Sequence, residues 1–308
     1  MSAVQRTTID WMRFRTRSDP PVGLNALRGL YGELGASLSL KHLDRGSDGF
    51  RSAAAVMLGG MVVGRVDYGG ESQRGWCRWN LTGQGCEWVK DWDAIDALES
   101  LPASELRRAD IALTTWSGEV GHDDVVAAHS VGRFSCGGRP PNLRQITNSD
   151  PRAGRTCYVG QRDADKFLRA YEKGLELAAK CPPSMHVTQI DGHAVEDIYR
   201  CEIELKAQTR PVPWEVVVRR DQYFAGSYPF CADVLPGVEP DILMRRPDRA
   251  PQTSLAVMLE YCRIQYGSAL FTALAAHGGS ITDVWNRVVG NCHNESLVEA
   301  GVLLVNHP

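Results

Sequence analysis

The sequence lacks the motifs of the commonest nucleotide-binding and hydrolytic enzymes. It contains no GxxxxGK followed by Ser or Thr, no GxGxxG that opens a helix, and no GxSxG turn. HExxH and His-x-His are also absent, and the eight histidines are isolated from one another. We therefore expect no ATP hydrolysis, and any metal chemistry must depend on carboxylates.

Long apolar runs and paired cysteines are missing too. The longest apolar stretch, Ala53–Gly64, contains three glycines and stops at Arg65, so it is too short to span a bilayer. The nine cysteines show neither CxxC nor zinc-site spacing, which is typical of buried reduced thiols. The N-terminus has no basic start followed by an apolar run. The sequence therefore predicts a cytoplasmic protein with no membrane partner.

What is present is an ordinary globular composition with uneven charge. Of the 308 residues 43% are hydrophobic and 23% are charged, enough apolar residues for a buried core. The net charge of −3 conceals a basic block between Arg133 and Lys173, in which nine cations face four acids. Such a block indicates a polyanionic partner, although solvated surface charge explains it about equally well.

Periodicity predicts short strands interleaved with helices. Expected strands are Ile9–Thr16, Met61–Tyr68, Gly75–Leu81, Arg107–Thr115, Thr156–Gln161, Lys166–Lys173 and Ile198–Ala207; expected helices are Leu24–Leu40, Asp91–Ser100, Asp123–Val131, Ser254–Ala276 and Ile281–Val289. Strict βαβ alternation is missing. We predict an α+β fold with antiparallel sheets, helices packed on them, a duplicated sheet/helix unit as one variant, and a helical C-terminal segment. The expected domains are a core, 1–247, with an internal boundary near 137–154, and the segment 248–308.

The strongest local pattern is YRCEIELKA, residues 199–207. Read as a strand, it places Arg200, Glu202, Glu204 and Lys206 on one face and apolar residues on the other. The two carboxylates then lie about 7 Å apart at Cα, which suits oxygen coordination of one hard divalent cation. A solvated strand face with paired charges is the alternative.

A second pattern surrounds Tyr171. As a strand, Lys166–Lys173 sets the Tyr171 phenol between Arg169 and Lys173. Positive neighbours lower the pKa of a phenol and bind a phosphodiester, as a phosphoryl-transfer nucleophile requires. The same residues also fit an amphipathic helix, and periodicity alone does not separate the two.

A third pattern is the acid within the apolar strand RRADIALTTW. Asp110 is costly there unless it is paired or bound to a cation. A satisfied structural carboxylate is the commoner explanation of one such residue.

Taken together, these segments resemble the trans-acting replication-initiation proteins of filamentous phages and rolling-circle plasmids, the replication initiation factor family. The matching stretches, in the family's order, are IDWMRF, LTGQGC, RADIAL, GRPPN, YVGQRDADKFLRAYEKG, YRCEIELK, DQYFAGSYP and YGSAL. They extend over most of the chain. The YVG…FLRAYEKG stretch followed by RxExE is fairly specific, whereas LTGQGC and FAGSYP are weaker.

The resemblance implies an origin-nicking enzyme that becomes covalently joined to the 5′ phosphate and leaves a 3′-OH primer. By this resemblance Tyr171 is the nucleophile, and Glu202, Glu204 and Asp110 form a Mg²⁺ or Mn²⁺ site. The family often has a second acid after the first, in an R-x-D-h-A-h-D pattern, where this chain has Thr114. The departure leaves the role of Asp110 open.

The basic residues complete the expected site. We expect Arg169 and Lys173 to steady the scissile phosphate. The expected DNA contacts are Arg139, Arg152, Arg155, Arg162, Lys166, Arg200 and Lys206. Implied partners are origin DNA with a single-stranded or extruded segment, and a host helicase and polymerase. The helical tail is expected to pack on the core or to support a homodimer. A non-catalytic origin-binding protein, and a nuclease that uses water, are the alternatives.

Overall fold

A computed structural model describes residues 5–182, 186–243, 255–293 and 298. The chain divides into two compact units, 1–245 and 246–308. The segment 137–154 lies inside the first unit. Each unit is described by itself.

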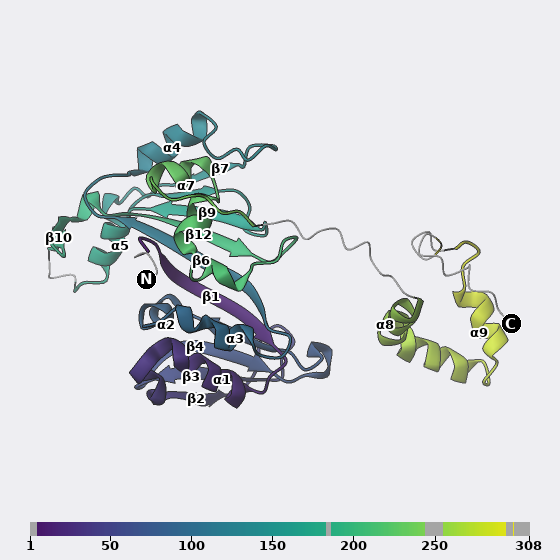
Figure 1. The fold of residues 1–308 in the computed structure, drawn as a ribbon. Helices are drawn as coiled ribbons and strands as arrows, with labels where there is room; N and C mark the ends of the chain where they lie inside the picture. The colour runs from purple at the N-terminus through teal and green to yellow at the C-terminus, as the bar shows by residue number, and fades with distance from the viewer. Residues whose placement is uncertain (1–4, 183–185, 244–254, 294–297, 299–308) are drawn as a thin grey trace. The chain divides into compact units, whose positions relative to one another are not determined.

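The first unit is built on one ten-stranded antiparallel sheet in the order β2-β3-β4-β5-β1-β6-β12-β9-β8-β7 (Figure 1). Its strands are β1 (Thr8–Thr16), β2 (Leu38–Leu43), β3 (Ser52–Leu58), β4 (Met61–Tyr68), β5 (Cys77–Leu81), β6 (Glu105–Thr115), β7 (Leu143–Ile146), β8 (Thr156–Val159), β9 (Lys166–Tyr171) and β12 (Tyr199–Lys206). A separate hairpin pairs β10 (Gln189–Ile190) with β11 (His193–Ala194).

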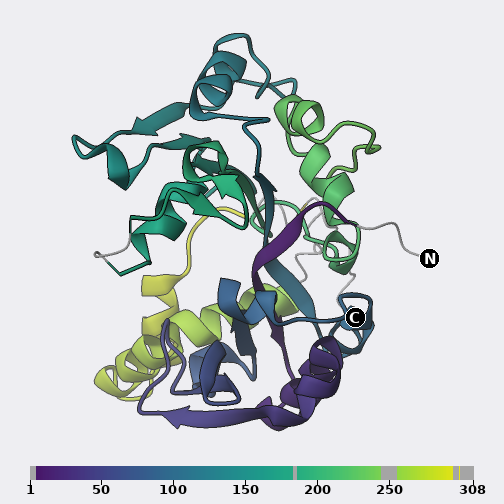
Figure 2. The ribbon, with the colours of Figure 1, turned by 90° about the vertical axis from the view of Figure 1, so that its left-hand side faces the viewer.

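Short helices connect the strands. They are α1 (Pro20–Arg28), α2 (Gly83–Glu87), α3 (Asp96–Glu99), α4 (His122–Ser130), α5 (Lys173–Ala179), α6 (Arg220–Ala225) and α7 (Pro229–Val234). Helices α1, α2 and α3 lie at the end of the sheet formed by β2–β5, and α4 and α7 lie at the opposite end (Figures 1 and 2).

The two halves of the sheet have the same topology. In each half a first strand, β1 or β6, leads through a helix into a three-strand meander, β2-β3-β4 or β7-β8-β9. The next sheet strand, β5 or β12, then inserts between the meander and the first strand. Strands β1 and β6 pair with each other and join the halves. The duplicated sheet/helix unit considered from the sequence is therefore present.

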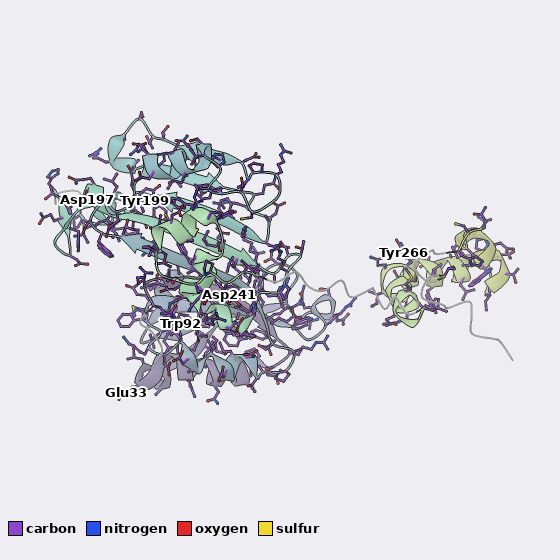
Figure 3. All side chains as sticks on the ribbon, turned by 45° about the horizontal axis from the view of Figure 1, so that its top comes forward. Glu33, Trp92, Asp197, Tyr199, Asp241 and Tyr266 are labelled. Carbon is purple, nitrogen blue, oxygen red and sulfur yellow. The ribbon has the colours of Figure 1, made fainter. Side chains whose placement is uncertain are left out.

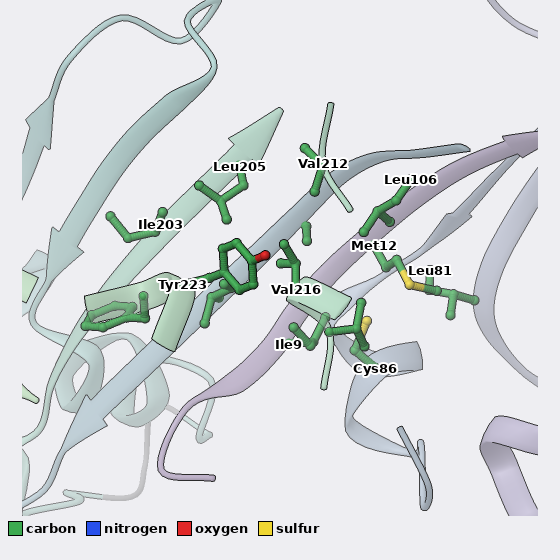
Figure 4. Packing of buried hydrophobic residues seen from close by; sticks show 14 of the residues in the cluster. Ile9, Met12, Leu81, Cys86, Leu106, Ile203, Leu205, Val212, Val216 and Tyr223 are labelled. Carbon is green, nitrogen blue, oxygen red and sulfur yellow. The ribbon is translucent and has the colours of Figure 1, made fainter. Parts of the chain in front are cut away.

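The two faces of the central strands differ sharply. Side chains alternate between faces along a strand, so cross-strand partners share one face. One face carries apolar side chains such as Met12 and Ile203, which pack with Val216 and Tyr223 in the core (Figure 4). The other face carries charged side chains, among them Asp110 and the carboxylates of β12. The two-residue alternation in the sequence of these strands thus places the core side chains on one face and the candidate site residues on the other.

The sequence predicted the fold class correctly and some element boundaries incorrectly. The expected helix Leu24–Leu40 ends at Arg28; a 3-10 helix, Gly29–Ser37, follows, and β2 begins at Leu38. Gly32 adopts φ 54° and interrupts helical geometry there. The expected strand Lys166–Lys173 ends at Tyr171, and Lys173 begins α5. The strands β2, β3 and β7 were not expected.

The second unit contains α8 (Leu255–Ala276) and α9 (Ile281–Val288). Ser280 caps α9 by accepting a hydrogen bond from the Asp283 N–H, a common N-terminal device. Within the described residues, no helix combines the length and apolarity that crossing a membrane requires.

Candidate active site

The register of β6, β12 and β9 gathers the expected site residues on the polar face. Arg200 lies opposite Tyr171 on β9 and opposite Thr114 on β6. Glu202 lies opposite Arg169, and Glu204 lies opposite Asp110. Directly opposite residues on neighbouring strands are about 5 Å apart, so these side chains are close neighbours. Residues spread over about ninety positions thereby form one site.

A cavity of about 680 Å³ opens over this face. Asp110, Glu202 and Glu204 line it, together with Asp10 and Asp48. Eight basic residues also line it: Arg13, Arg15, Arg78, Arg107, Arg108, Arg162, Arg169 and Lys206. Eight cations against five acids make the cavity locally positive, although the chain as a whole has a net charge of −3.

Asp110 and Glu204 share one guanidinium. Arg108 donates to both carboxylate oxygens of Asp110, with distances of 2.7 and 2.5 Å, and its Nη2 lies 3.4 Å from Glu204 Oε2. Lys206 Nζ lies 2.7 Å from the same Glu204 oxygen. Asp110 is 2% exposed, so this pairing satisfies the buried acid. The two carboxylates are therefore held together by positive charge.

Glu202 and Arg200 make separate pairs. Arg169 Nη2 donates to Glu202 over 2.7 Å. Arg200 Nη1 lies 2.9 Å from Asp10 Oδ1, and its Nε donates to Thr114 Oγ1 over 2.9 Å. Thr114 thus accepts a hydrogen bond from an arginine at the position where the family often has an acid.

Burial changes the protonation of the acids. It raises the pKa of Asp110 to about 7, against the lowering effect of Arg108. Burial also raises the pKa of Glu202, again opposed by an arginine, Arg169. Glu204 and Glu202 both add to the upward shift at Asp110. Near neutral pH, Asp110 is consequently divided between its protonated and ionised forms.

Tyr171 is buried to 9% exposure and flanked by cations. The Arg169 Cζ lies 4.6 Å and the Lys173 Nζ 5.6 Å from the ring centroid. Burial nevertheless raises the pKa of Tyr171 to about 12, since desolvation outweighs the lowering by Arg200 and Arg169. Arg169 does lower this pKa, as the sequence analysis expected of a flanking cation, but desolvation, which that expectation left out, has the larger effect.

The surroundings of Lys173 also differ from those expected. It begins α5 and is not a strand neighbour of Tyr171. Its Nζ pairs with Glu176 over 2.6 Å, and its side chain is 11% exposed. Lys173 Nζ nevertheless lies 5.6 Å from the centroid of the Tyr171 ring.

Other tyrosines lie in different surroundings. Tyr199 is 3% exposed and its hydroxyl, buried on β12, has no hydrogen-bond partner among the described residues (Figure 3). Tyr266, in α8 of the second unit, is 58% exposed (Figure 3). Tyr158 lies on β8 opposite Arg169 and stacks on Phe167, with ring centroids 5.4 Å apart. Tyr158 and Tyr171 therefore lie on the same face of the sheet.

Asp110, Glu202 and Glu204 have the chemistry to bind a divalent cation, but in this structure they are paired with cations of the chain. Three carboxylates on two adjacent strands supply hard oxygen ligands. Each is, however, already paired with Arg108, Arg169 or Lys206. In the part of the chain that the structure describes, no group of three or more His, Cys, Asp or Glu side chains is arranged to hold a metal ion. An ion would have to replace these cations.

The expected DNA-binding residues do not form one surface. Arg162 and Lys206 line the cavity, and Arg200 lies on the same face. Lys166 points to the other face, opposite Leu205, where its Nζ donates to the Ser227 carbonyl.

The remaining three lie outside the cavity. Arg155 is paired with Glu172 and Asp123, at 2.9 and 3.1 Å. Arg139 is exposed in a loop, and the Arg152 side chain is 88% exposed beside Asp150.

Several cavity residues were missed from the sequence. Asp10 occupies a register shift of β1, between Ile9 and Trp11, which turns it towards Arg200. Arg13 lies opposite Arg108, at the junction of the two sheet halves. The bulge and the pairing of β1 with β6 are tertiary features, so a local sequence pattern could not predict that Asp10 and Arg13 lie at the site. The opening IDWMRF stretch was the one available indication.

Comparisons with known proteins concern the family and the fold. Residues 104–241, which carry β6, β9 and β12, match the family model described as replication initiation factor. Among proteins with curated descriptions, none matches the sequence significantly.

The fold resembles that of a solved structure. A rolling circle replication initiator protein from Geobacillus stearothermophilus aligns over 77% of this chain and 99% of its own, with a TM-score of 0.53 and 20% identity. At this identity the likeness establishes the fold alone.

Proposed function

We propose that the chain initiates rolling-circle replication by nicking one strand of an origin through Tyr171. The observation that carries this proposal is the register that sets Tyr171 opposite Arg200, two residues along the strands from the Arg169–Glu202 pair and on the same face. A phenol, cations and carboxylates on one face are the groups that phosphodiester transfer requires. The match of residues 104–241 to the family model described as replication initiation factor supports it.

In the proposed step the Tyr171 oxygen attacks the scissile phosphorus and the bond to the 3′ oxygen breaks. The phenol loses its proton to water, and the departing 3′ oxygen takes up a proton and becomes the primer hydroxyl. Arg169 and Lys173, both near the Tyr171 ring, stabilise the charge on the phosphate oxygens. The phosphotyrosine ester conserves the energy of the broken bond, so the strand can be rejoined without ATP.

The metal site remains part of the proposal. Glu202, Glu204 and Asp110 would hold a Mg²⁺ or Mn²⁺ ion after releasing their arginine and lysine partners. When bound, the ion would polarise the scissile phosphate. Because the sequence lacks a Walker motif, unwinding and synthesis would fall to a host helicase and polymerase acting as partners.

A second candidate function is origin binding without catalysis. It is favoured by one observation, namely that Asp110, Glu202 and Glu204 are all neutralised by cations of the chain itself. A site held in this way could bind DNA phosphates and perform no chemistry.

Covalent trapping tests the proposal directly. A supercoiled plasmid that carries the replication origin of the phage or plasmid encoding this protein is incubated with the protein and Mg²⁺. The product is then separated under denaturing conditions. We expect a protein–DNA adduct through the 5′ phosphate, which Tyr171→Phe abolishes. Tyr158→Phe is the matched control and should leave it intact, because Tyr158 shares the face but lies one strand farther out.

Each remaining outcome selects an alternative. An adduct that persists in Tyr171→Phe refutes the assignment of the nucleophile. Origin binding with intact DNA selects the non-catalytic function. Nicked DNA with a free 5′ phosphate selects a nuclease that uses water.

A further inference from the structure

A bulge in β1 brings one acid of the first sheet half to the cavity. A register shift between Ile9 and Trp11 makes Asp10 the extra residue on β1, opposite β6. A bulge re-aims the side chain that it inserts, so Asp10 lines the cavity on the polar face while Ile9 packs in the core. The first half therefore supplies the site with an acid that lies outside the matched segment 104–241.

The Asp10 carboxylate is paired with Arg200. Arg200 Nη1 lies 2.9 Å from Asp10 Oδ1, and Arg200 Nε donates to Thr114 Oγ1 over 2.9 Å. Two partners on two different nitrogens fix both the position and the tilt of a planar guanidinium, because rotation would break one of the contacts. The side chains of Arg200 and Asp10 are 17 and 31% exposed, so solvent screens this pair less than a pair on the open surface.

Gly83 leaves room for this carboxylate. A Cβ atom at Gly83 would lie 3.1 Å from the Asp10 carbonyl oxygen and 3.6 Å from Asp10 Oδ1. The first distance is closer than most Cβ contacts, so a side chain at Gly83 would press on the bulge. The LTGQGC and IDWMRF stretches of the sequence thus meet at Asp10, which is held by packing as well as by its ion pair.

The guanidinium that Asp10 holds faces the proposed nucleophile. Arg200 lies directly opposite Tyr171 on β9. Burial raises the pKa of Tyr171 to about 12, and among the cations that oppose this shift Arg200 has the largest effect. A positive charge at this place stabilises the negative charge that develops on the phenol oxygen and on the phosphate during attack.

We propose that Asp10 is a positioning residue for nicking, which together with Thr114 holds the Arg200 guanidinium against Tyr171 and the scissile phosphate. Asp10 acts through Arg200 and makes no contact with the DNA. Orientation matters because a group misplaced by about 1 Å can lower a rate on the order of 100-fold. The inference rests on the proposed function, since it takes Tyr171 as the nucleophile, and it makes the first half of the sheet part of the catalytic apparatus.

Single-turnover nicking tests this role. Full-length protein in excess is mixed with the origin plasmid at several Mg²⁺ concentrations, and both the rate of adduct formation and the dissociation constant for DNA are measured. Asp10→Ala should lower the rate about tenfold, as expected for loss of a charge-assisted hydrogen bond, and change the dissociation constant by less than about twofold. Asp10→Asn retains an oxygen acceptor and should lower the rate less. If Asp10→Ala does not fold, Asp10→Asn carries the test.

Two further measurements separate positioning from a structural role. Adding Thr114→Asp to Asp10→Ala should restore the rate to within about threefold of the parent, because an acid on β6 would then face the Arg200 guanidinium. In an Arg200→Lys protein, removal of Asp10 should have little further effect, since the two residues act as one unit. The matched control, Asp233→Ala, breaks an Asp–Arg pair outside this cavity, in which Arg133 Nε donates to Asp233 over 2.7 Å. It should react at the parent rate.

Three results would overturn the proposal. The first is an Asp10→Ala rate equal to that of Asp233→Ala. The second is a loss of rate that Thr114→Asp does not restore or that Arg200→Lys does not mask. The third is a raised Mg²⁺ requirement in Asp10→Ala, which would make Asp10 a metal ligand instead.

Failure of this inference is distinguishable from failure of the proposed function. A parent protein that forms no adduct refutes the proposed function, and this inference with it. A parent protein that forms the adduct, and an Asp10→Ala variant that forms it equally fast, refute the inference alone.

Discussion

Arg169 donates a hydrogen bond to Glu202 over 2.7 Å across neighbouring strands. Arg169, which we propose contacts the scissile phosphate, and Glu202, which we propose binds the metal, are therefore paired with each other in this structure. The Glu202 side chain is 4% exposed, so the pair also satisfies a buried charge. Phosphate and metal binding would each have to separate this pair, which couples the two events.

The first prediction concerns the carboxylates of β12. Glu202→Gln and Glu204→Gln retain size but remove the charge that a hard cation needs. We expect at least one of them to abolish nicking of an origin plasmid in Mg²⁺ and to leave origin binding nearly intact. Glu33→Gln, an exposed glutamate outside the cavity, should nick normally. Undiminished wild-type nicking in EDTA would refute the metal site.

The second prediction follows from the pKa of Asp110, raised from 3.8 to about 7 by burial. Between these two values the folded protein binds the proton that the unfolded chain releases, so this group lowers stability as pH rises from about 4 to about 7. Asp110→Asn removes the titration. Thermal unfolding measured across this window should show a smaller loss of stability in the variant than in the wild type. Parallel pH profiles would contradict the assignment.

A third prediction separates two arginines of the basic block. Arg162, which lines the cavity, should contact DNA, and Arg162→Gln should weaken origin binding and reduce its salt dependence. Arg155 instead clamps Glu172 with two guanidinium hydrogen bonds of 3.0 and 2.9 Å. Arg155→Gln should cost about 1 kcal/mol of unfolding free energy and change DNA affinity little. Denaturant unfolding and salt titrations of DNA binding are measured for both variants. Loss of stability in Arg162→Gln and loss of DNA affinity in Arg155→Gln would contradict this assignment.

The fourth prediction concerns the second unit. Its helix α8 exposes Leu259, Ile264 and Phe271 at 58, 50 and 76%. We propose that residues 246–308 support self-association and take no part in catalysis. A protein that ends at Arg245 should keep its thermal stability and its nicking activity, while its mass by light scattering falls to that of a monomer. A truncated protein that is folded and has an unchanged oligomeric state, yet cannot nick, would contradict this.

Local patterns in the sequence were sufficient to predict much of the fold and the charged face of its central strand. The alternation of Arg200, Glu202 and Glu204 with Cys201 and Ile203 predicted a strand with one charged face, because side chains alternate along a strand whatever its partners. The α+β class followed from the mixture of two-residue and helical periods.

Features that depend on contacts between distant segments, or on overlapping strand and helix patterns, could not be predicted from local patterns. The end of β9 at Tyr171, and hence the place of Lys173 in α5, was wrong in the sequence analysis, because strand and helix patterns overlap over these residues. The upward shift of the Tyr171 pKa depends on what covers the ring. The bulge that turns Asp10 to Arg200 depends on the pairing of β1 with β6.

By itself, then, the sequence determined which residues could perform chemistry and which strand faces they occupy, since both follow from residue type and a local period. Only the tertiary structure decided that β1 and β6 join two similar halves and bring Arg13 to the cavity that holds Asp110. Strand order and register arise from contacts between segments far apart in the chain, and burial arises from their packing. These contacts set the pairing of each acid with a cation and the pKa values of the site.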